Sequence, residues 1–167
     1  MKLDFVAALF LTAGAMKLKL ALLQIAPYGN DQNRNLAKGL QYCRNAKALG
    51  ADLVVFPELW TVGSAQGRLL DRTEQRLWTS SAIDRHSTFF QCFADLARDL
   101  KMNIAITYLE VSNPKPRNSV SIINTRGDVV LNYSKVCICD FAPDAESGGG
   151  CAERRRTDCR AECLRLA

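Results

Sequence analysis

The segment at residues 53–60, Leu-Val-Val-Phe-Pro-Glu-Leu-Trp, constrains the fold of this chain more than any other stretch. Four apolar residues, two of them β-branched, lead into Pro57 and then into the carboxylate of Glu58. Such a run is typical of a parallel strand that is covered on both faces, and a proline cannot continue it. The segment therefore predicts a buried parallel strand with Glu58 at its carboxyl end, the edge where open α/β sheets place their reactive groups.

Strand and helix patterns alternate before and after this segment. Residues 18–25 form an apolar run that predicts a second covered strand. Residues 33–49 carry apolar side chains at the spacing of one helical face, and Gly50 is placed to end that helix. Short helical turns are expected within the more polar residues 64–81. The alternation predicts an α/β fold with parallel strands.

A phenylalanine-rich stripe predicts a further helix between residues 84 and 100, with Ser87 or Asp84 as its N-cap. We interpret this stripe as core packing. The apolar residues 103–110 follow at once and predict another buried strand. Asn113, Pro114 and Pro116 supply the break after it.

The next part of the chain predicts antiparallel strands at residues 119–125 and 129–133, joined by a tight Arg-Gly-Asp turn. The same tripeptide occurs in adhesion motifs, but three residues between two strands are far more often only a turn. Lys135 follows the second strand. A lysine at a strand end is usually a solvated charge, so its importance depends on what lies beside it.

Composition excludes several classes of protein. With 167 residues, 48% of them hydrophobic and 23% charged, the chain can bury the core of one domain. Its net charge of +5 is spread along the sequence, apart from a run at Arg154, Arg155 and Arg156, and no basic stripe alternates with aromatics. We therefore expect no nucleic-acid partner. Seven cysteines, an odd number without framework spacing, favour a reducing compartment and a cytoplasmic location.

The cysteines do not predict a metal site. Cys43 and Cys92 fall on the apolar faces of expected helices, where a buried structural thiol is the usual interpretation. The remaining five have Cys-x-Cys and Cys-x3-Cys spacings that match no common zinc ribbon, and they are Cys137, Cys139, Cys151, Cys159 and Cys163. We expect neither a metal nor another cofactor.

The first fifteen residues allow two interpretations. Lys2, an apolar run and Ala13-Gly14-Ala15 resemble a short signal peptide, although the run is too short to span a bilayer. Alternatively, Met16 is the natural start and residues 1–15 are an upstream extension, which we favour because a core strand begins almost at once. The chain is thus divided into residues 1–15, a main domain at 16–146, and a Gly/Arg/Cys-rich tail at 147–167 that is expected to be disordered or frame-shifted.

Residues 18–146 together resemble the nitrilase superfamily of carbon-nitrogen hydrolases. Two motifs carry the resemblance: Val-Val-Phe-Pro-Glu58-Leu-Trp-Thr-Val-Gly63 after a strand, and a hairpin that runs from Asn118 into Tyr133-Ser-Lys135. The resemblance implies an α-β-β-α sandwich, here incomplete, and a Glu-Lys-Cys triad in which Glu58 and Lys135 are the catalytic residues. It also implies a small amide, carbamoyl amine or nitrile as substrate, no cofactor, no membrane partner, and a homo-oligomer when folded.

The third member of that triad has no counterpart in the sequence. The family's nucleophile lies beyond the lysine in a motif similar to Gly-x-x-x-Cys-Tyr-Asp, and no such motif follows Glu146. The abrupt change of composition there suggests a frameshift or truncation. Glu146 and Asp144 are both candidates for the family's second glutamate. Two functions stay open: a carbon-nitrogen hydrolase that lacks its cysteine, or an inactive remnant or non-catalytic partner subunit.

Overall fold

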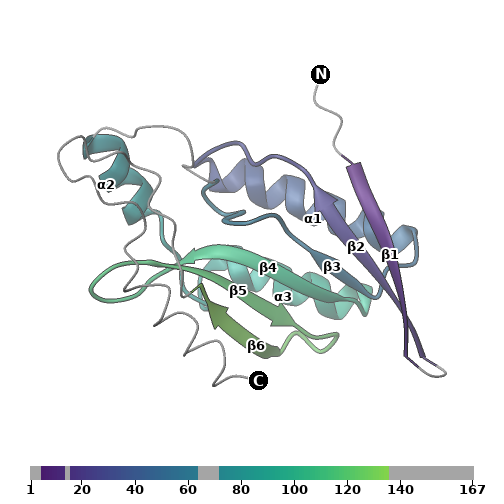
Figure 1. Ribbon diagram of the computed structural model, residues 1–167. Helices are drawn as coiled ribbons and strands as arrows, with labels where there is room; N and C mark the ends of the chain where they lie inside the picture. Colours follow the sequence, from purple (N-terminus) through teal and green to yellow (C-terminus); the bar gives the residue numbers. More distant parts are fainter. Residues whose placement is uncertain (1–4, 14–15, 64–71, 136–167) are drawn as a thin grey trace, which may run out of the picture.

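The structure of the chain, a computed structural model, describes residues 5–13, 16–63 and 72–135. Its centre is a six-stranded sheet in the order β1-β2-β3-β4-β5-β6, with three helices (Figure 1). The elements, in chain order, are β1 (Phe5–Ala13), β2 (Met16–Gln24), α1 (Gln32–Ala48), β3 (Leu53–Val55), α2 (Arg72–Ser80), α3 (Thr88–Leu100), β4 (Asn103–Glu110), β5 (Arg117–Ile123) and β6 (Val129–Ser134).

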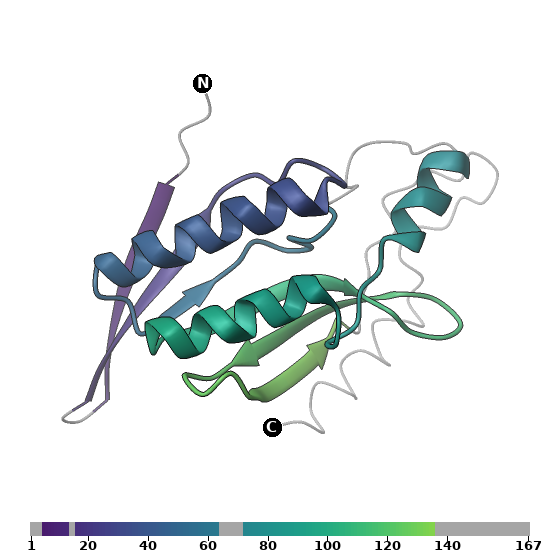
Figure 2. The same ribbon diagram turned by 180° about the vertical axis from the view of Figure 1, so that it is seen from behind.

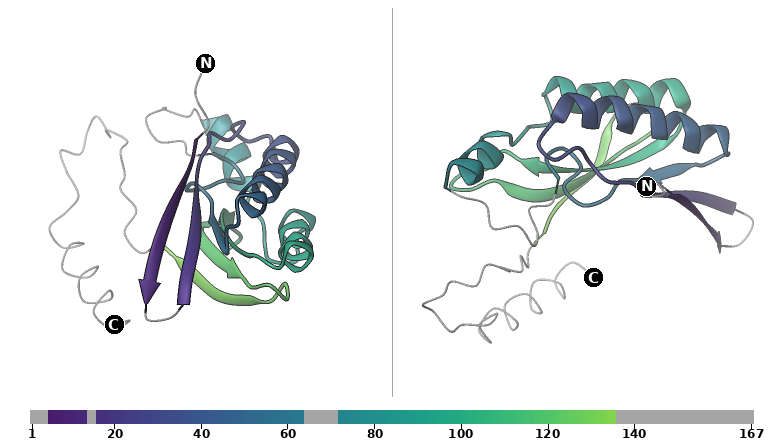
Figure 3. Two further views of the ribbon diagram at one scale, coloured as in Figure 1. Left: turned by 90° about the vertical axis from the view of Figure 1, so that its right-hand side faces the viewer. Right: turned by 90° about the horizontal axis from the view of Figure 1, so that it is seen from above.

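The sheet is parallel in its middle and antiparallel at both sides. Strands β2, β3 and β4 run parallel, as the apolar runs predicted, while β1 pairs antiparallel with β2, and β4, β5 and β6 form an antiparallel meander. Helices α1 and α3 both lie against one face of this sheet (Figures 2 and 3). The described residues therefore supply one helical layer and one sheet layer of the expected α-β-β-α sandwich.

The expected stop of α1 and one of the two expected N-caps of α3 are present, and Asp31 adds an N-cap to α1 that was not predicted from the sequence. Asp31 caps α1 by accepting a hydrogen bond from the backbone N–H of Arg34, and Gly50 follows the helix with a φ of +81°. Of the two candidate caps for α3, Ser87 is the one used, because its hydroxyl accepts from the N–H of Phe90 at 3.3 Å. These caps fix where each helix starts relative to the strand that it covers.

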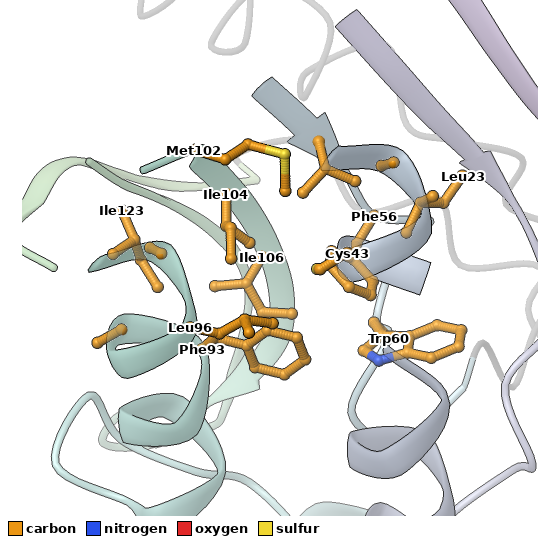
Figure 4. Close-up of a cluster of buried hydrophobic side chains, with 14 of the residues drawn as sticks. Leu23, Cys43, Phe56, Trp60, Phe93, Leu96, Met102, Ile104, Ile106 and Ile123 are labelled. Atoms are coloured by element: carbon orange, nitrogen blue, oxygen red, sulfur yellow. The ribbon is translucent and has the colours of Figure 1, made fainter. Parts of the chain in front are cut away.

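The core fills the space between the two helices and the sheet (Figure 4). Aromatic side chains contact one another within it, with ring centroids 5.3 Å apart for Phe56 and Trp60 and again for Phe56 and Phe93. Gly39 allows α1 to lie this close, since a Cβ there would meet Phe93 Cζ at 2.8 Å and Trp60 Nε1 at 2.9 Å. Trp60, two residues after Glu58, is thus anchored in the core.

Two parts of the chain were less well anticipated. Residues 5–13 form β1, which pairs along its whole length with β2, so the segment expected as an extension or signal contributes an edge strand; its origin as extension or signal stays a prediction. Of the expected helical turns at 64–81, α2 is present, and residues 64–71 lie outside the described residues. Among the described helices none is both long and apolar enough to cross a membrane.

Candidate active site

Glu58 lies on a tight turn that leaves the sheet just after β3. The N–H of Phe56 still donates to the carbonyl of Ala105 in β4 at 3.1 Å, and Pro57 then ends the pairing. Leu59 has a φ of +53°, a conformation that costs a non-glycine residue free energy, and its carbonyl accepts from the N–H of Gly63 at 2.8 Å. Contacts between this turn and strand β4 stabilise the unfavourable conformation of Leu59.

Thr107 on β4 provides two of those contacts. Its hydroxyl donates to the carbonyl of Pro57 and accepts from the N–H of Trp60 at 3.2 Å, on either side of Glu58. Leu59 and Val62 pack on Leu109 of the same strand in a small buried cluster. Because Thr107 and Leu109 are on the sheet face opposite Tyr108, which packs against Phe90 of α3, the turn lies across the face that the helices leave open.

The partners of Glu58 come from β5 and from the residue after β6. Lys135 Nζ lies 2.6 Å from Glu58 Oε1, and Asn118 Nδ2 donates to the same oxygen at 2.6 Å. The backbone joins the two partners as well, since the N–H of Lys135 donates to the carbonyl of Asn118 at 2.8 Å. The structure therefore brings together both residues predicted for the site, Glu58 and Lys135, and adds Asn118.

These contacts change the acidity of Glu58. The hydrogen bond from Lys135 is the largest influence and lowers the pKa of the carboxyl, and the hydrogen bond from Asn118 and the charge of the ammonium act in the same direction. Partial burial raises the pKa and is the second-largest influence, but the three lowering effects together outweigh it, so the pKa of Glu58 lies below its ordinary value. At neutral pH the group is an ionised carboxylate that can accept a proton.

An open pocket of about 360 Å³ surrounds this pair. Its walls come from the turn after β3 and from the ends of β4, β5 and β6, and its lining residues are Glu58, Thr107, Asn118, Ser119, Val120, Tyr133 and Lys135. The pocket thus presents a carboxylate, an ammonium and an amide beside apolar wall residues. A small polar ligand with a carbonyl or similar group fits this chemistry.

The two described cysteines lie elsewhere. Cys43 is fully buried on the core-facing side of α1, and burial raises the pKa of its thiol. Cys92 on α3 is partly exposed, and neither cysteine lines the pocket. The candidates Cys137, Cys139, Cys151, Cys159 and Cys163, together with Asp144 and Glu146, lie outside the described residues. Within residues 5–13, 16–63 and 72–135, no group of three His, Cys, Asp or Glu side chains is placed to bind a metal ion.

Sequence reasoning assigned no role to Asn118 or Thr107. Asn118 is two residues before Val120 on β5, so strand alternation places both on the open face, and its backbone pairing with Lys135 follows from the hairpin register. That register could have identified Asn118 once Lys135 was chosen. Thr107 looks like an ordinary strand residue in the sequence. Its contribution is visible only in the structure, where its hydroxyl bonds the backbone of the turn that carries Glu58.

Comparison with known proteins places the fold in a family. Residues 19–154 match the family model described as carbon-nitrogen hydrolase. A glutamine-dependent NAD(+) synthetase from Thermotoga maritima is 26% identical over 125 residues, which is 75% of this chain and 20% of that protein.

Solved structures agree with this placement. An amidase from Nesterenkonia sp. superposes with a TM-score of 0.52 and 20% identity over 72% of this chain and 43% of its own. The C. elegans NitFhit protein superposes with a TM-score of 0.59 and 16% identity over 80% of this chain and 31% of its own. The chain thus spans less than half the length of the proteins that it matches, and the expected fold class, a nitrilase-type sandwich in incomplete form, is confirmed.

Proposed function

The chain belongs to the carbon-nitrogen hydrolase family, and we propose that it serves the hydrolysis of a non-peptide carbon–nitrogen bond in a small amide, carbamoyl amine or nitrile. The observation that carries this proposal is the contact between Glu58 and Lys135 at the edge of the pocket, 2.6 Å between Oε1 and Nζ. A base and a fixed cation beside one open pocket are two of the groups that acyl transfer from an amide requires.

Glu58 acts in this proposal as the general base. The carboxylate of Glu58 is ionised at neutral pH, so it can take the proton of a cysteine thiol as the sulfur attacks the substrate carbon. The contact with Lys135 that lowers its pKa makes it a weaker base, and its value as a base comes from its position at the pocket. For an amide, the proton then passes to the nitrogen of the departing amine as the C–N bond breaks. The same carboxylate later accepts a proton from the water that attacks the thioester, and returns it to the sulfur as the C–S bond breaks. A positioned proton transfer of this kind contributes about 10²- to 10⁴-fold in rate.

Lys135 stabilises the oxyanion that develops when sulfur adds to the carbonyl carbon. Its ammonium is held at the rim of the pocket by Glu58 and by the register of β6 with β5, so little reorganisation is needed when the negative charge forms. A lysine free in solvent would have to be ordered at that moment. The ion pair therefore holds both the Lys135 ammonium and the Glu58 carboxylate in place at the pocket.

A second, non-catalytic function stays a candidate because no cysteine nucleophile lines the pocket among the described residues. Neither Cys43 nor Cys92 lines the pocket, so the described residues provide the base and the cation without a thiol between them. A chain with this arrangement also suits a non-catalytic partner subunit or an inactive remnant. Association of the chain with itself and a cytoplasmic location stay predictions.

Ammonia release from a panel of small amides and nitriles, measured on the purified full chain, tests the proposal. We expect release that is lost in Glu58→Gln and in Lys135→Met but retained in Asp99→Asn, which removes an exposed carboxylate on α3. Release that survives Glu58→Gln contradicts the proposed base. No release from the parent chain favours the non-catalytic function.

A further inference from the structure

A second carboxylate lies on the opposite face of the sheet from Glu58, at the end of β4. Ser119 Oγ donates to Glu110 Oε2 at 2.6 Å, Ser134 Oγ donates to the same oxygen at 3.3 Å, and the two hydroxyls are 2.9 Å apart. Asn132 Nδ2 donates to Glu110 Oε1 at 3.3 Å. One carboxylate on β4 thus binds side chains of both β5 and β6, which lie side by side in Figure 1.

The register relates this cluster directly to the candidate active site. Ser119 and Ser134 are paired across β5 and β6, and the neighbouring residues Asn118 and Lys135 are joined by a backbone hydrogen bond of 2.8 Å. Alternate residues of a strand point to opposite faces. The serines therefore contact Glu110 on the helix side, while Asn118 and Lys135 contact Glu58 on the open side.

We propose that Glu110 is a positioning residue for the site: by binding Ser119 and Ser134 it holds the end of β6 against β5, so that Asn118 and Lys135 meet Glu58. Strand β6 is the last strand of the sheet among the described residues, and its pairing with β5 has a register shift at Ile122 and Ile123, so a side-chain contact from β4 helps to fix its position. The inference deepens the proposed function of Glu58 and Lys135 and rests on it. Its test uses the pKa of Glu58, which is measurable whether or not the chain hydrolyses a substrate.

The sign of the effect separates positioning from simple electrostatics. If Glu110 acted on Glu58 only through its negative charge, removing that charge would lower the pKa of Glu58 further. If Glu110 positions Lys135 and Asn118, its removal weakens the two hydrogen bonds that lower this pKa. The pKa of Glu58 then rises toward its ordinary value of about 4.3.

The experiment follows the carboxyl carbon of Glu58 by NMR titration of the full chain with labelled glutamate, using Glu58→Gln to assign the signal. We expect Glu110→Ala, and Ser119→Ala combined with Ser134→Ala, to raise the pKa of Glu58. In Glu110→Gln the pKa of Glu58 should rise less than in Glu110→Ala, because the glutamine amide oxygen still accepts from the hydroxyls of Ser119 and Ser134. Backbone amide spectra verify that each variant is folded.

Ser121→Ala is the matched control, since it removes a buried hydroxyl from the same face of β5 without a direct bond to Glu110. The proposal is overturned if Glu110→Ala leaves or lowers the pKa of Glu58, or if Ser121→Ala raises it equally. The double serine variant keeps the chain's charge, so it decides the question even if Glu110→Ala does not fold. Absence of hydrolysis in the parent chain would contradict the proposed function alone.

Discussion

Lys135 Nζ contacts Glu58 Oε1 at 2.6 Å although 77 positions separate the two residues and the strands that they follow, β6 and β3, are not neighbours in the sheet. Strands β4 and β5 lie between them, so the contact depends on the turn after β3 crossing the open face of β4. Thr107 and Leu109 hold that turn from below. The site is therefore a product of one turn and one hairpin end, not of two adjacent strands.

This contact predicts a pH dependence of stability. The pKa of Glu58 is lowered on folding, so its contribution is fully present above the unfolded value of about 4.3 and is lost as the pH falls through the lower folded value. Because both side chains are 39% exposed, Lys135→Met should cost at most about 1 kcal/mol at pH 7. Urea unfolding of parent and variant should show this difference shrinking toward pH 3, and an equal difference at both pH values contradicts it.

Asn118→Ala should raise the pKa of Glu58 less than Lys135→Met does. The alanine variant removes the hydrogen bond that the Asn118 amide donates to Glu58 Oε1. Lys135→Met removes a stronger hydrogen bond together with the neighbouring positive charge. Carboxyl NMR titration of the two variants gives the comparison, with Asn124→Ala in the β5–β6 turn as the control. A larger rise for Asn118→Ala would mean that the amide, not the ammonium, chiefly lowers the pKa of Glu58.

Thr107→Val should loosen the turn that holds Glu58. Valine has the same shape but cannot donate to the carbonyl of Pro57 or accept from the N–H of Trp60. Leaving these groups without partners costs about 1–3 kcal/mol. Denaturant unfolding measures this loss, and Thr107→Ser, which keeps the hydroxyl, should retain most of the stability. Equal losses in both variants would show that the methyl group matters rather than the hydrogen bonds.

The sequence predicted those parts of the fold that local patterns determine. Strand β4 was expected at its observed bounds, and the caps at Ser87 and Gly50 agree with the structure, because periodicity and capping depend on residues close together in the chain. Strand β1 was not expected as part of the sheet. Its place depends on pairing with β2, and an apolar segment near the start of a chain has other common uses.

In the candidate site, too, residues within local sequence motifs could be predicted, and residues that act through distant contacts could not. Glu58 and Lys135 could be chosen from their motifs, and their contact agrees with that choice, while their catalytic roles stay predictions. Thr107 and Glu110 could not be chosen, since each acts through contacts with segments distant in sequence. A residue that supports a site from another strand carries no local pattern of its own.

Gly39→Ala should destabilise the chain even though alanine is the better helix former. Helix propensity alone would stabilise α1 by about 1 kcal/mol. The new Cβ, however, would lie 2.8 Å from Phe93 Cζ and 2.9 Å from Trp60 Nε1, and overpacking of a core typically costs about 1–3 kcal/mol. Thermal unfolding should show a net loss for Gly39→Ala and little change for Arg44→Ala at an exposed position of the same helix. A gain in stability would mean that the core shifts easily to accept the methyl group.

Cys43 should be unreactive toward thiol reagents while the chain is folded, and this bears on which cysteine could serve the site. Only the thiolate attacks such reagents, and burial both raises the pKa of Cys43 and excludes the reagent. Peptide mass spectrometry after brief labelling should find Cys92 modified before Cys43, with both modified in denaturant. Fast native labelling of Cys43, or loss of hydrolysis in a folded Cys43→Ala variant, would mean that α1 opens toward the pocket. Slow labelling leaves the base and the cation in need of a thiol from outside the described residues.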